Sequence, residues 1–278
     1  MAGLLGVERL THVVDIGANP IDGEPPYRPL MDARLCRITG FEPQEAALAK
    51  LNLRKGSNEK YLGHALGDGK EHTLHICAYS GWTSIYRPSA AALEVFASFK
   101  DAARVVDELR IHTHRLDDVE EIDTIDLLKI DIQGAELMVF ANGREKLKSA
   151  AVIHTETQFV QLYEGQPTFN DIDQELRAQG FIPHKFAAVK GGAIGPLPSA
   201  RSRPLSQMIE ADVVYVRDIV HPDDMGDDQL KQLGLIAHAC YGSHDLTGRC
   251  LALLEARQAV STGALPQYVQ ILERSLSS

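Results

Sequence analysis

The stretch DLLKIDIQGAELMVF, from Asp126 to Phe140, decides the predicted fold. Its first half is a short apolar run, typical of a parallel strand covered on both faces, and apolar residues resume at helical spacing after Gly134. Two charged residues, Lys129 and Asp131, lie two positions apart, so their side chains project from the same face of the strand. Asp131 comes at the carboxyl end, where open α/β sheets bind ligands. A structural ion pair and a catalytic pair are both consistent with this pattern.

The composition is that of an ordinary globular protein. The chain has 278 residues, 44% hydrophobic and 24% charged, enough for one large α/β domain and a small appendage. Its net charge of -10 argues against nucleic acid and anionic membranes as partners, because basic surfaces bind these. No apolar run approaches the roughly 20 residues that span a bilayer, and no signal peptide is recognisable at the start. With four scattered cysteines, which suit reduced thiols, we expect a cytoplasmic protein without a membrane span.

Two predicted strand ends near the amino terminus are candidates for a cofactor site. The strand Leu10 to Ile16 runs into the segment Asp15 to Asn19, where an acid and small residues leave backbone amides open to a ligand. This segment lacks the G-x-G-x-x-G pattern of dinucleotide-binding loops. The next strand, Cys36 to Phe41, is followed by Glu42 and Pro43. Glu42 is either an acid at a helix start or a carboxylate that binds ribose hydroxyls, and we favour the second interpretation, ribose binding.

The other predicted elements alternate as in an α/β fold. Strands are expected at residues 61–66, 71–77, 103–114, 151–157, 181–189 and 211–217, and helices at 28–34, 44–53, 90–99 and 169–179, the last capped by Asn170. Trp82, in a hydroxyl-rich loop, either stacks on a ligand ring or belongs to the core. His112 and His114 alternate along a strand, and we interpret them as solvated rather than as a metal pair.

A second strand with a charged end follows the first. His154 and Glu156 share one face of the predicted strand 151–157, as Lys129 and Asp131 do on the strand before it. Ionisable residues at the carboxyl ends of neighbouring parallel strands form a polar cleft, which a purely structural sheet does not need. The loop from Gln158 to Thr168 is expected to cover this cleft. The cleft is the main functional signal of the sequence.

Two further segments are less informative. The loop 193–207 is long enough to cover a substrate, and its Arg201 and Arg203 either meet an anionic substrate group or are solvated. Residues 218–278 show three apolar patterns at helical spacing. We predict two units, a main domain of residues 1–217 and a helical appendage of residues 218–278 that could form a homodimer.

Four motifs together resemble the FkbM-type methyltransferases. They are VVDIGAN at 13–19, GFEPQ at 40–44, LLKIDIQGAE at 127–136 and HTETQFVQLYEGQPTF at 154–169. The resemblance covers roughly residues 10 to 217. It implies an α/β class I methyltransferase fold, with a Rossmann-like, mostly parallel sheet of seven strands whose last strand is reversed. It also implies S-adenosylmethionine as cofactor and O-methylation of a hydroxyl on a sugar, glycan or natural-product acceptor.

The resemblance also implies roles for single residues. The methionine part of the cofactor would lie against Asp15, Gly17, Ala18 and Asn19, the ribose hydroxyls against Glu42 beside Pro43, and the adenine near Ala65 and Leu66. The sequence departs from the family at two places. Pro20 and the loop after it replace the glycine that is common after the first strand, and Gln133 stands where many members have glutamate.

An acceptor hydroxyl must lose its proton during methyl transfer, so a base is expected at the strand ends. The candidates are His154 and Asp131, with Glu156 orienting the histidine and Lys129 or Glu136 holding the local charge. A divalent metal bound by Asp131, His154 and Glu156 is a second, less favoured interpretation. A nicotinamide-dependent oxidoreductase and a non-catalytic nucleotide-binding module are the alternatives from other functional classes.

Overall fold

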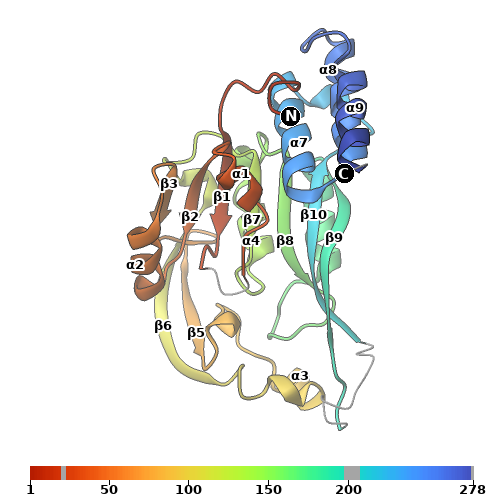
Figure 1. The fold of residues 1–278 in the computed structure, drawn as a ribbon. Helices are drawn as coiled ribbons and strands as arrows, with labels where there is room; N and C mark the ends of the chain where they lie inside the picture. Colours follow the sequence, from red (N-terminus) through yellow and green to blue (C-terminus); the bar gives the residue numbers. More distant parts are fainter. Residues whose placement is uncertain (20–22, 197–206, 277–278) are drawn as a thin grey trace.

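A seven-stranded sheet forms the centre of the computed structural model, which describes residues 1–19, 23–196 and 207–276 (Figure 1). Its strand order is β3-β2-β1-β7-β8-β10-β9. The bounds are β1 (Thr11–Ile16), β2 (Cys36–Phe41), β3 (Glu59–Leu62), β7 (Leu127–Ile130), β8 (Val152–Gln158), β9 (Phe181–Gly192) and β10 (Gln207–Arg217). Only β10 runs antiparallel to its neighbours, β8 and β9. The predicted mostly parallel sheet with a reversed last strand is confirmed.

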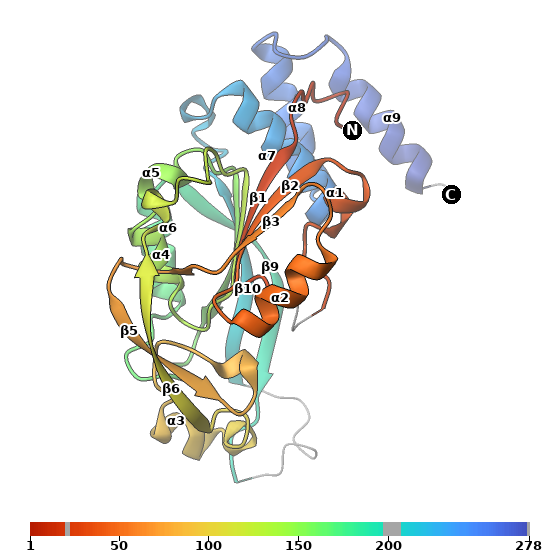
Figure 2. The same ribbon diagram turned by 90° about the vertical axis from the view of Figure 1, so that its left-hand side faces the viewer.

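Alternating side chains bury both faces of this sheet. Val13 of β1 and Leu127 of β7 belong to one cluster of buried side chains, whereas the next residues, Val14 and Leu128, belong to a second cluster on the opposite face. This alternation follows from the two-residue period of a strand. Figure 2 shows α4, α5 and α6 on one side of the sheet and α1, α2 and α7 on the other. Two covered faces explain why these strands read as continuous apolar runs.

Most helices agree with the predicted segments apart from their ends, but the short helix Arg144–Leu147 was not predicted and the helix expected at 90–99 ends at Val95. The helices are α1 (Arg28–Asp32), α2 (Glu45–Arg54), α3 (Ala90–Val95), α4 (Glu136–Ala141), α5 (Arg144–Leu147), α6 (Phe169–Ala178), α7 (Asp227–Tyr241), α8 (His244–Ala256) and α9 (Ala264–Leu276). The predicted cap at Asn170 is wrong. Thr168 and Asp171 form a capping box at the start of α6, because the Asp171 carboxylate accepts a hydrogen bond from the Thr168 backbone amide at 2.7 Å.

The single strand predicted at 61–66 is two strands in two different sheets. Strand β3 ends at Leu62 in the main sheet, and β4 (Ala65–Leu66) pairs with β6 (Val105–His114). Strand β6 also pairs with β5 (Glu71–Cys77), so these three strands form a separate sheet below the main one (Figure 1). His112 and His114 are exposed on β6, as expected of solvated histidines.

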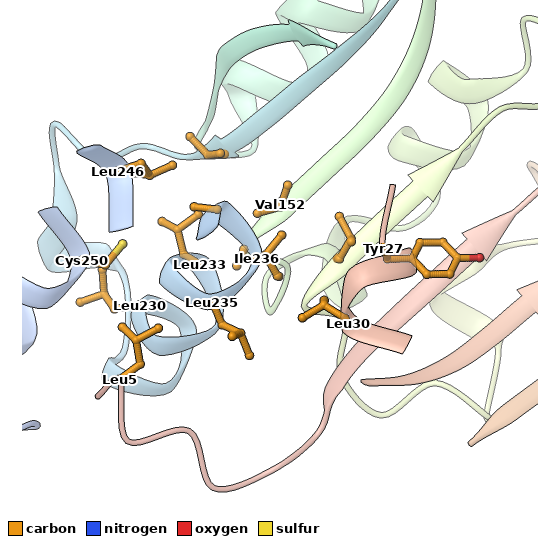
Figure 3. Packing of buried hydrophobic residues seen from close by; sticks show 14 of the residues in the cluster. Leu5, Tyr27, Leu30, Val152, Leu230, Leu233, Leu235, Ile236, Leu246 and Cys250 are labelled. Carbon is orange, nitrogen blue, oxygen red and sulfur yellow. The ribbon is translucent and has the colours of Figure 1, made fainter. Parts of the chain in front are cut away.

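Helix α7 covers one face of the main sheet. Its Leu233 and Ile236 belong to the same buried cluster as Leu30 of α1 and Val152 of β8 (Figure 3). This cluster therefore contains side chains from both sides of residue 217. The division of the chain into two units, residues 1–217 and 218–278, stays a prediction. A homodimer through the carboxyl-terminal helices and a cytoplasmic location also stay predictions. Every helix in the described part of the chain is too short or too polar to cross a bilayer.

Candidate active site

A cavity of about 970 Å³ lies at the carboxyl ends of the parallel strands, with walls from both sheets. Twelve predicted site residues line it: Asp15, Gly17, Ala18, Asn19, Glu42, Pro43, Ala65, Leu66, Lys129, Asp131, His154 and Glu156. Glu136 is absent from this lining. Residues far apart in the sequence are thus brought to one site, as expected where strands of an open α/β sheet end together.

The turn after β1 packs tightly against the ends of its two neighbouring strands, β2 and β7. The backbone amides of Gly17 and Ala18 donate to the carbonyl of Phe41, at 3.0 and 3.1 Å. Gly17 has a positive φ of +80°, and a Cβ placed there would lie only 2.1 Å from the carbonyl oxygen of Asp131. Glycine is therefore required at this position both for its backbone conformation and for the close approach.

Asp15 and Lys129 form an ion pair in the cavity wall. Asp15 is only 3% exposed, and its Oδ2 accepts a hydrogen bond from the hydroxyl of Tyr27 at 2.6 Å. Lys129 Nζ lies 3.5 Å from Asp15 Oδ1 and donates to the Gly17 carbonyl at 3.2 Å. Burial raises the pKa of Asp15, although Lys129 and Tyr27 partly offset this effect. Burial alone would lower the pKa of Lys129, but Asp15, Asp131 and Glu156 raise it overall.

Glu42 connects the loops that follow β1 and β2. Its carboxylate is almost fully buried, and Oε1 accepts a hydrogen bond from the Gln44 amide at 2.8 Å. Burial raises the pKa of Glu42, while the backbone amides of Gln44 and Asn19 act in the opposite direction. Gln44 is the N-cap of α2, so the carboxylate supports the helix start and faces the cavity as well. The two interpretations of Glu42 do not exclude each other.

Strand pairing places three carboxylates in one row across β7, β8 and β10. Ile130 pairs with Thr155, so the following residues, Asp131 and Glu156, are level with each other, and Glu156 pairs with Asp212. Neighbouring strands lie about 4.8 Å apart. We name Asp131, Glu156 and Asp212 the carboxylate row, and all three line the cavity.

Sequence reasoning missed Asp212 and the nearby Lys190, which also lines the cavity. Lys190 Nζ lies 2.7 Å from Glu210 Oε1 and 3.9 Å from Glu156 Oε2. The available signal was the alternation of Glu210 and Asp212 with apolar residues along β10. Such alternation shows that the acids share a face but not which neighbouring strand they meet.

Glu156 is buried among hydrogen-bond donors. Its Oε1 accepts from Gln158 Nε2 at 2.5 Å and from Gln133 Nε2 at 3.4 Å. Burial, with the charge of Asp131 and other nearby acids, raises the pKa of Glu156 well above its ordinary value. Glu156 therefore binds a proton more readily than a free glutamate does.

Gln133 connects the carboxylate row to the loop 158–168. Its Nε2 donates to Asp131 Oδ1 at 3.0 Å, and its Oε1 accepts from the hydroxyl of Tyr163, in that loop, at 3.1 Å. Gln133 has a φ of +57°, which is uncommon for a residue other than glycine and is often found at functional sites. Both ends of its amide are thus engaged in positioning other groups.

His154 has a different partner from the one that the sequence suggested. Its Nδ1 lies 3.1 Å from the hydroxyl of Tyr241 at the end of α7, and the two rings stack with centroids 5.9 Å apart. The predicted orientation of His154 by Glu156 is therefore wrong, because Glu156 bonds to the glutamines instead. Burial, followed by the charge of Lys129, lowers the pKa of His154 to about 4. The imidazole is accordingly neutral at neutral pH.

Two other candidates belong to the scaffold. Glu136 is fully buried, and its Oε1 accepts from the backbone amides of Ile132 and Gly134, at 2.8 and 3.2 Å. These hydrogen bonds stabilise the turn after β7, and Glu136 lies outside the cavity lining. Trp82 packs against Phe99 and Tyr163, with ring centroids 5.3 and 5.5 Å away, which favours its interpretation as a core residue.

Two predictions concern substrate arginines and a metal. Arg201 and Arg203 lie outside the described residues, so their predicted role stays a prediction. Across residues 1–19, 23–196 and 207–276, no group of three or more His, Cys, Asp or Glu side chains is arranged to hold a metal ion. The ligand set of Asp131, His154 and Glu156 is therefore not assembled.

Comparison with known proteins gives the family. The family model of the methyltransferase FkbM domain matches residues 15–183. The chain belongs to the FkbM methyltransferase family. This membership confirms the resemblance to the FkbM-type methyltransferases that the four sequence motifs carry. The match includes the predicted cofactor residues and the ends of β7 and β8.

Individual proteins are similar over shorter or weaker matches. The 2-O-methyltransferase NoeI of Sinorhizobium fredii (strain NBRC 101917 / NGR234) is 30% identical over an alignment of 174 residues. The alignment covers 55% of this chain and 66% of that protein, slightly under two thirds of its length. Among solved structures, magnesium protoporphyrin IX methyltransferase from Synechocystis PCC 6803, with bound SAM, has 11% identity and a TM-score of 0.39, covering 78% of this chain and 76% of that one. Precorrin-6y C5,15-methyltransferase from Geobacter metallireducens GS-15 has 12% identity and a TM-score of 0.36, covering 77% and 84%.

Proposed function

We propose that this protein transfers a methyl group from S-adenosylmethionine to a hydroxyl of a sugar, glycan or natural-product acceptor. The observation that carries the proposal is that one cavity, of about 970 Å³, joins the loops after β1 and β2 to the carboxylate row. Family membership supports methyl transfer. The name of the relative, a 2-O-methyltransferase, favours oxygen as the acceptor atom.

The cavity residues fit S-adenosylmethionine. Asp15 Oδ1 is buried and receives no hydrogen bond from the described residues, so it suits the ammonium group of the amino-acid end. Glu42 is a carboxylate at the end of β2, the usual place for an acid that binds ribose hydroxyls. Ala65 and Leu66 of β4 give an apolar wall for the adenine. We assign the cofactor to this half of the cavity, with Gly17 providing the close approach of the backbone.

The other half of the cavity would bind the acceptor. When bound, S-adenosylmethionine supplies an electrophilic methyl group on a sulfonium. The protein must hold the acceptor oxygen in line with that methyl group and take its proton, and positioning alone is worth several powers of ten in rate. Carboxylates only accept hydrogen bonds, so Asp131 and Asp212 favour an acceptor rich in hydroxyls.

Asp131 and His154 are the two candidate bases. When His154 Nδ1 donates to the Tyr241 hydroxyl, Nε2 is left as an acceptor for the substrate proton. Its lowered pKa keeps the imidazole unprotonated but makes it a weak base. We prefer Asp131 as the proton acceptor because of its position, at the end of β7 in the carboxylate row, with His154 orienting the hydroxyl. Lys129 balances the negative charge around them.

The experiment compares Asp131→Asn, His154→Ala and His221→Ala. His221 is an exposed histidine outside the cavity and serves as the matched control. We expect transfer of a tritiated methyl group to a panel of hydroxyl acceptors to fall at least about 100-fold in the first two variants. Their affinity for S-adenosylhomocysteine, measured by calorimetry, should stay within about twofold. Near-normal rates of methyl transfer in both variants would contradict this assignment of the base. A wild-type protein whose thermal unfolding temperature is raised by NAD but not by S-adenosylhomocysteine would contradict the proposed function.

A further inference from the structure

Tyr27 connects the apolar cluster under α7 to the cofactor half of the cavity. It is the N-cap of α1 and is only 3% exposed. Its ring packs in the cluster that contains Leu30 and Ile236, while its hydroxyl points away from that cluster (Figure 3). The hydroxyl donates to Asp15 Oδ2 at 2.6 Å. The ring is thus anchored in the core, and the hydroxyl fixes one oxygen of a buried acid.

The other oxygen of Asp15 has an ion-pair partner, Lys129, but no hydrogen bond from the described residues. This oxygen, Oδ1, is buried, and Lys129 Nζ lies 3.5 Å away. Buried acceptors in folded proteins nearly always have a partner. Because Asp15 lines the cavity, the missing donor is expected to come from a ligand.

Charged and titratable groups surround Asp15 on several elements. They are Tyr27 at α1, Lys129 on β7, Asp131 after β7, Glu42 after β2 and Tyr61 on β3. Burial is the largest influence and raises the pKa of Asp15; Lys129 and Tyr27 lower it, and Asp131 raises it. Removal of the Tyr27 hydroxyl therefore shifts the pKa of Asp15 further upward.

We propose that Tyr27 is a positioning residue whose hydroxyl holds the Asp15 carboxylate with Oδ1 turned into the cavity, where Oδ1 accepts a hydrogen bond from the ammonium group of the cofactor's amino-acid end. The inference rests on the proposed function, because it takes S-adenosylmethionine as the ligand. It goes further by assigning the carboxylate's orientation and ionisation to a residue outside the strand-end motifs.

The test is Tyr27→Phe, which keeps the ring in the core and removes only the hydroxyl. The probe is S-adenosylhomocysteine, whose dissociation constant is measured by calorimetry from about pH 5 to about pH 9. Near neutral pH we expect about tenfold weaker binding, the typical effect of losing a hydrogen bond to a charged group. Binding needs the ionised Asp15, so affinity falls as the pH falls through its pKa. In Tyr27→Phe this fall should begin at a higher pH.

Tyr215→Phe is the matched control. Tyr215 is also buried and also donates to a carboxylate, Asp173 Oδ1, at 3.3 Å, but it does not line the cavity. We expect its affinity for S-adenosylhomocysteine to equal that of the wild type at every pH. A loss of affinity in Tyr27→Phe that is equal at every pH would indicate a merely structural role and overturn the proposal.

Asp15→Asn gives a second test that depends less on the stability of a single variant. It removes the titrating group, so adding Tyr27→Phe to it should no longer shift the pH profile. A further shift in the double variant would overturn the proposal. If wild type does not bind S-adenosylhomocysteine, the proposed function fails as well. If wild type binds it and Tyr27→Phe behaves as Tyr215→Phe does, only the role of Tyr27 fails.

Discussion

Gly17→Ala should separate the cofactor loop from the end of β7. A Cβ at position 17 would lie 2.1 Å from the Asp131 carbonyl oxygen, so the two segments must move apart by about 1 Å. The positive φ of +80° costs a side chain about 1–2 kcal/mol, and the overpacking costs about 1–3 kcal/mol more. We therefore expect the free energy of unfolding to fall by about 2–5 kcal/mol.

The matched control is Gly165→Ala. Gly165 has a similar φ of +71°, but a Cβ there would meet no atom within 4 Å. This variant pays only the conformational cost, about 1–2 kcal/mol. In thermal unfolding, Gly165→Ala should lower Tm by about 2–8 °C and Gly17→Ala by about 4–20 °C, at about 2–4 °C per kcal/mol for a protein of this size.

Turnover gives the functional readout. The segment that must move carries Asp131, and a 1 Å misplacement near reacting groups is worth about 100-fold in rate. We expect Gly17→Ala to lose about that factor in methyl transfer, and Gly165→Ala to keep the wild-type rate. Equal losses of Tm in the two variants, together with unchanged turnover in Gly17→Ala, would refute the reasoning.

Two further predictions concern stability. Burial raises the pKa of Glu136 from 4.5 to about 7. Between these two pH values the carboxyl group of Glu136 is protonated in the folded state and ionised in the unfolded state. The free energy of unfolding therefore falls as the pH rises from about 4.5 to about 7. Glutamine cannot ionise, so between pH 5 and pH 8 the unfolding free energy of Glu136→Gln, measured by urea denaturation, should rise by about 3 kcal/mol relative to that of wild type. Parallel plots of unfolding free energy against pH for the two proteins would argue against this. Arg9→Ala removes a two-bond contact, at 2.6 and 2.8 Å, from the buried Asp126, and should cost about 1–3 kcal/mol. Lys148→Ala, which breaks the exposed pair with Glu145, should cost under about 0.5 kcal/mol, and an equal cost would contradict the importance of burial.

Local patterns explain what the sequence could predict. The apolar runs of β1 and β7 show directly that both sheet faces are covered, because a doubly covered parallel strand needs apolar residues at nearly every position. The carboxyl ends of such strands meet at one edge of the sheet. It follows that Asp15, Lys129 and Asp131 could be assigned to a common site from the order of strands alone.

Contacts between distant segments explain what the sequence could not predict. Tyr241 meets His154 across 87 positions of the chain, and no periodicity within α7 distinguishes a tyrosine that contacts His154 from one that packs elsewhere in the core. Asp212 is similar, because its place beside Glu156 depends on the register between β10 and β8. A shift of one residue in that register would turn Asp212 to the opposite face.

The register also brings the acids at this edge of the sheet close together. Pairing places Asp15, Lys129 and His154 in one row across β1, β7 and β8, and the carboxylate row comes immediately after it. The carboxylate row holds three acids, and the cost of this crowding appears as the raised pKa of Glu156. Well-packed apolar residues at these positions would give a sheet at least as stable. We therefore propose that these acids bind ligand groups, an ammonium at Asp15 and acceptor hydroxyls at Asp131 and Asp212.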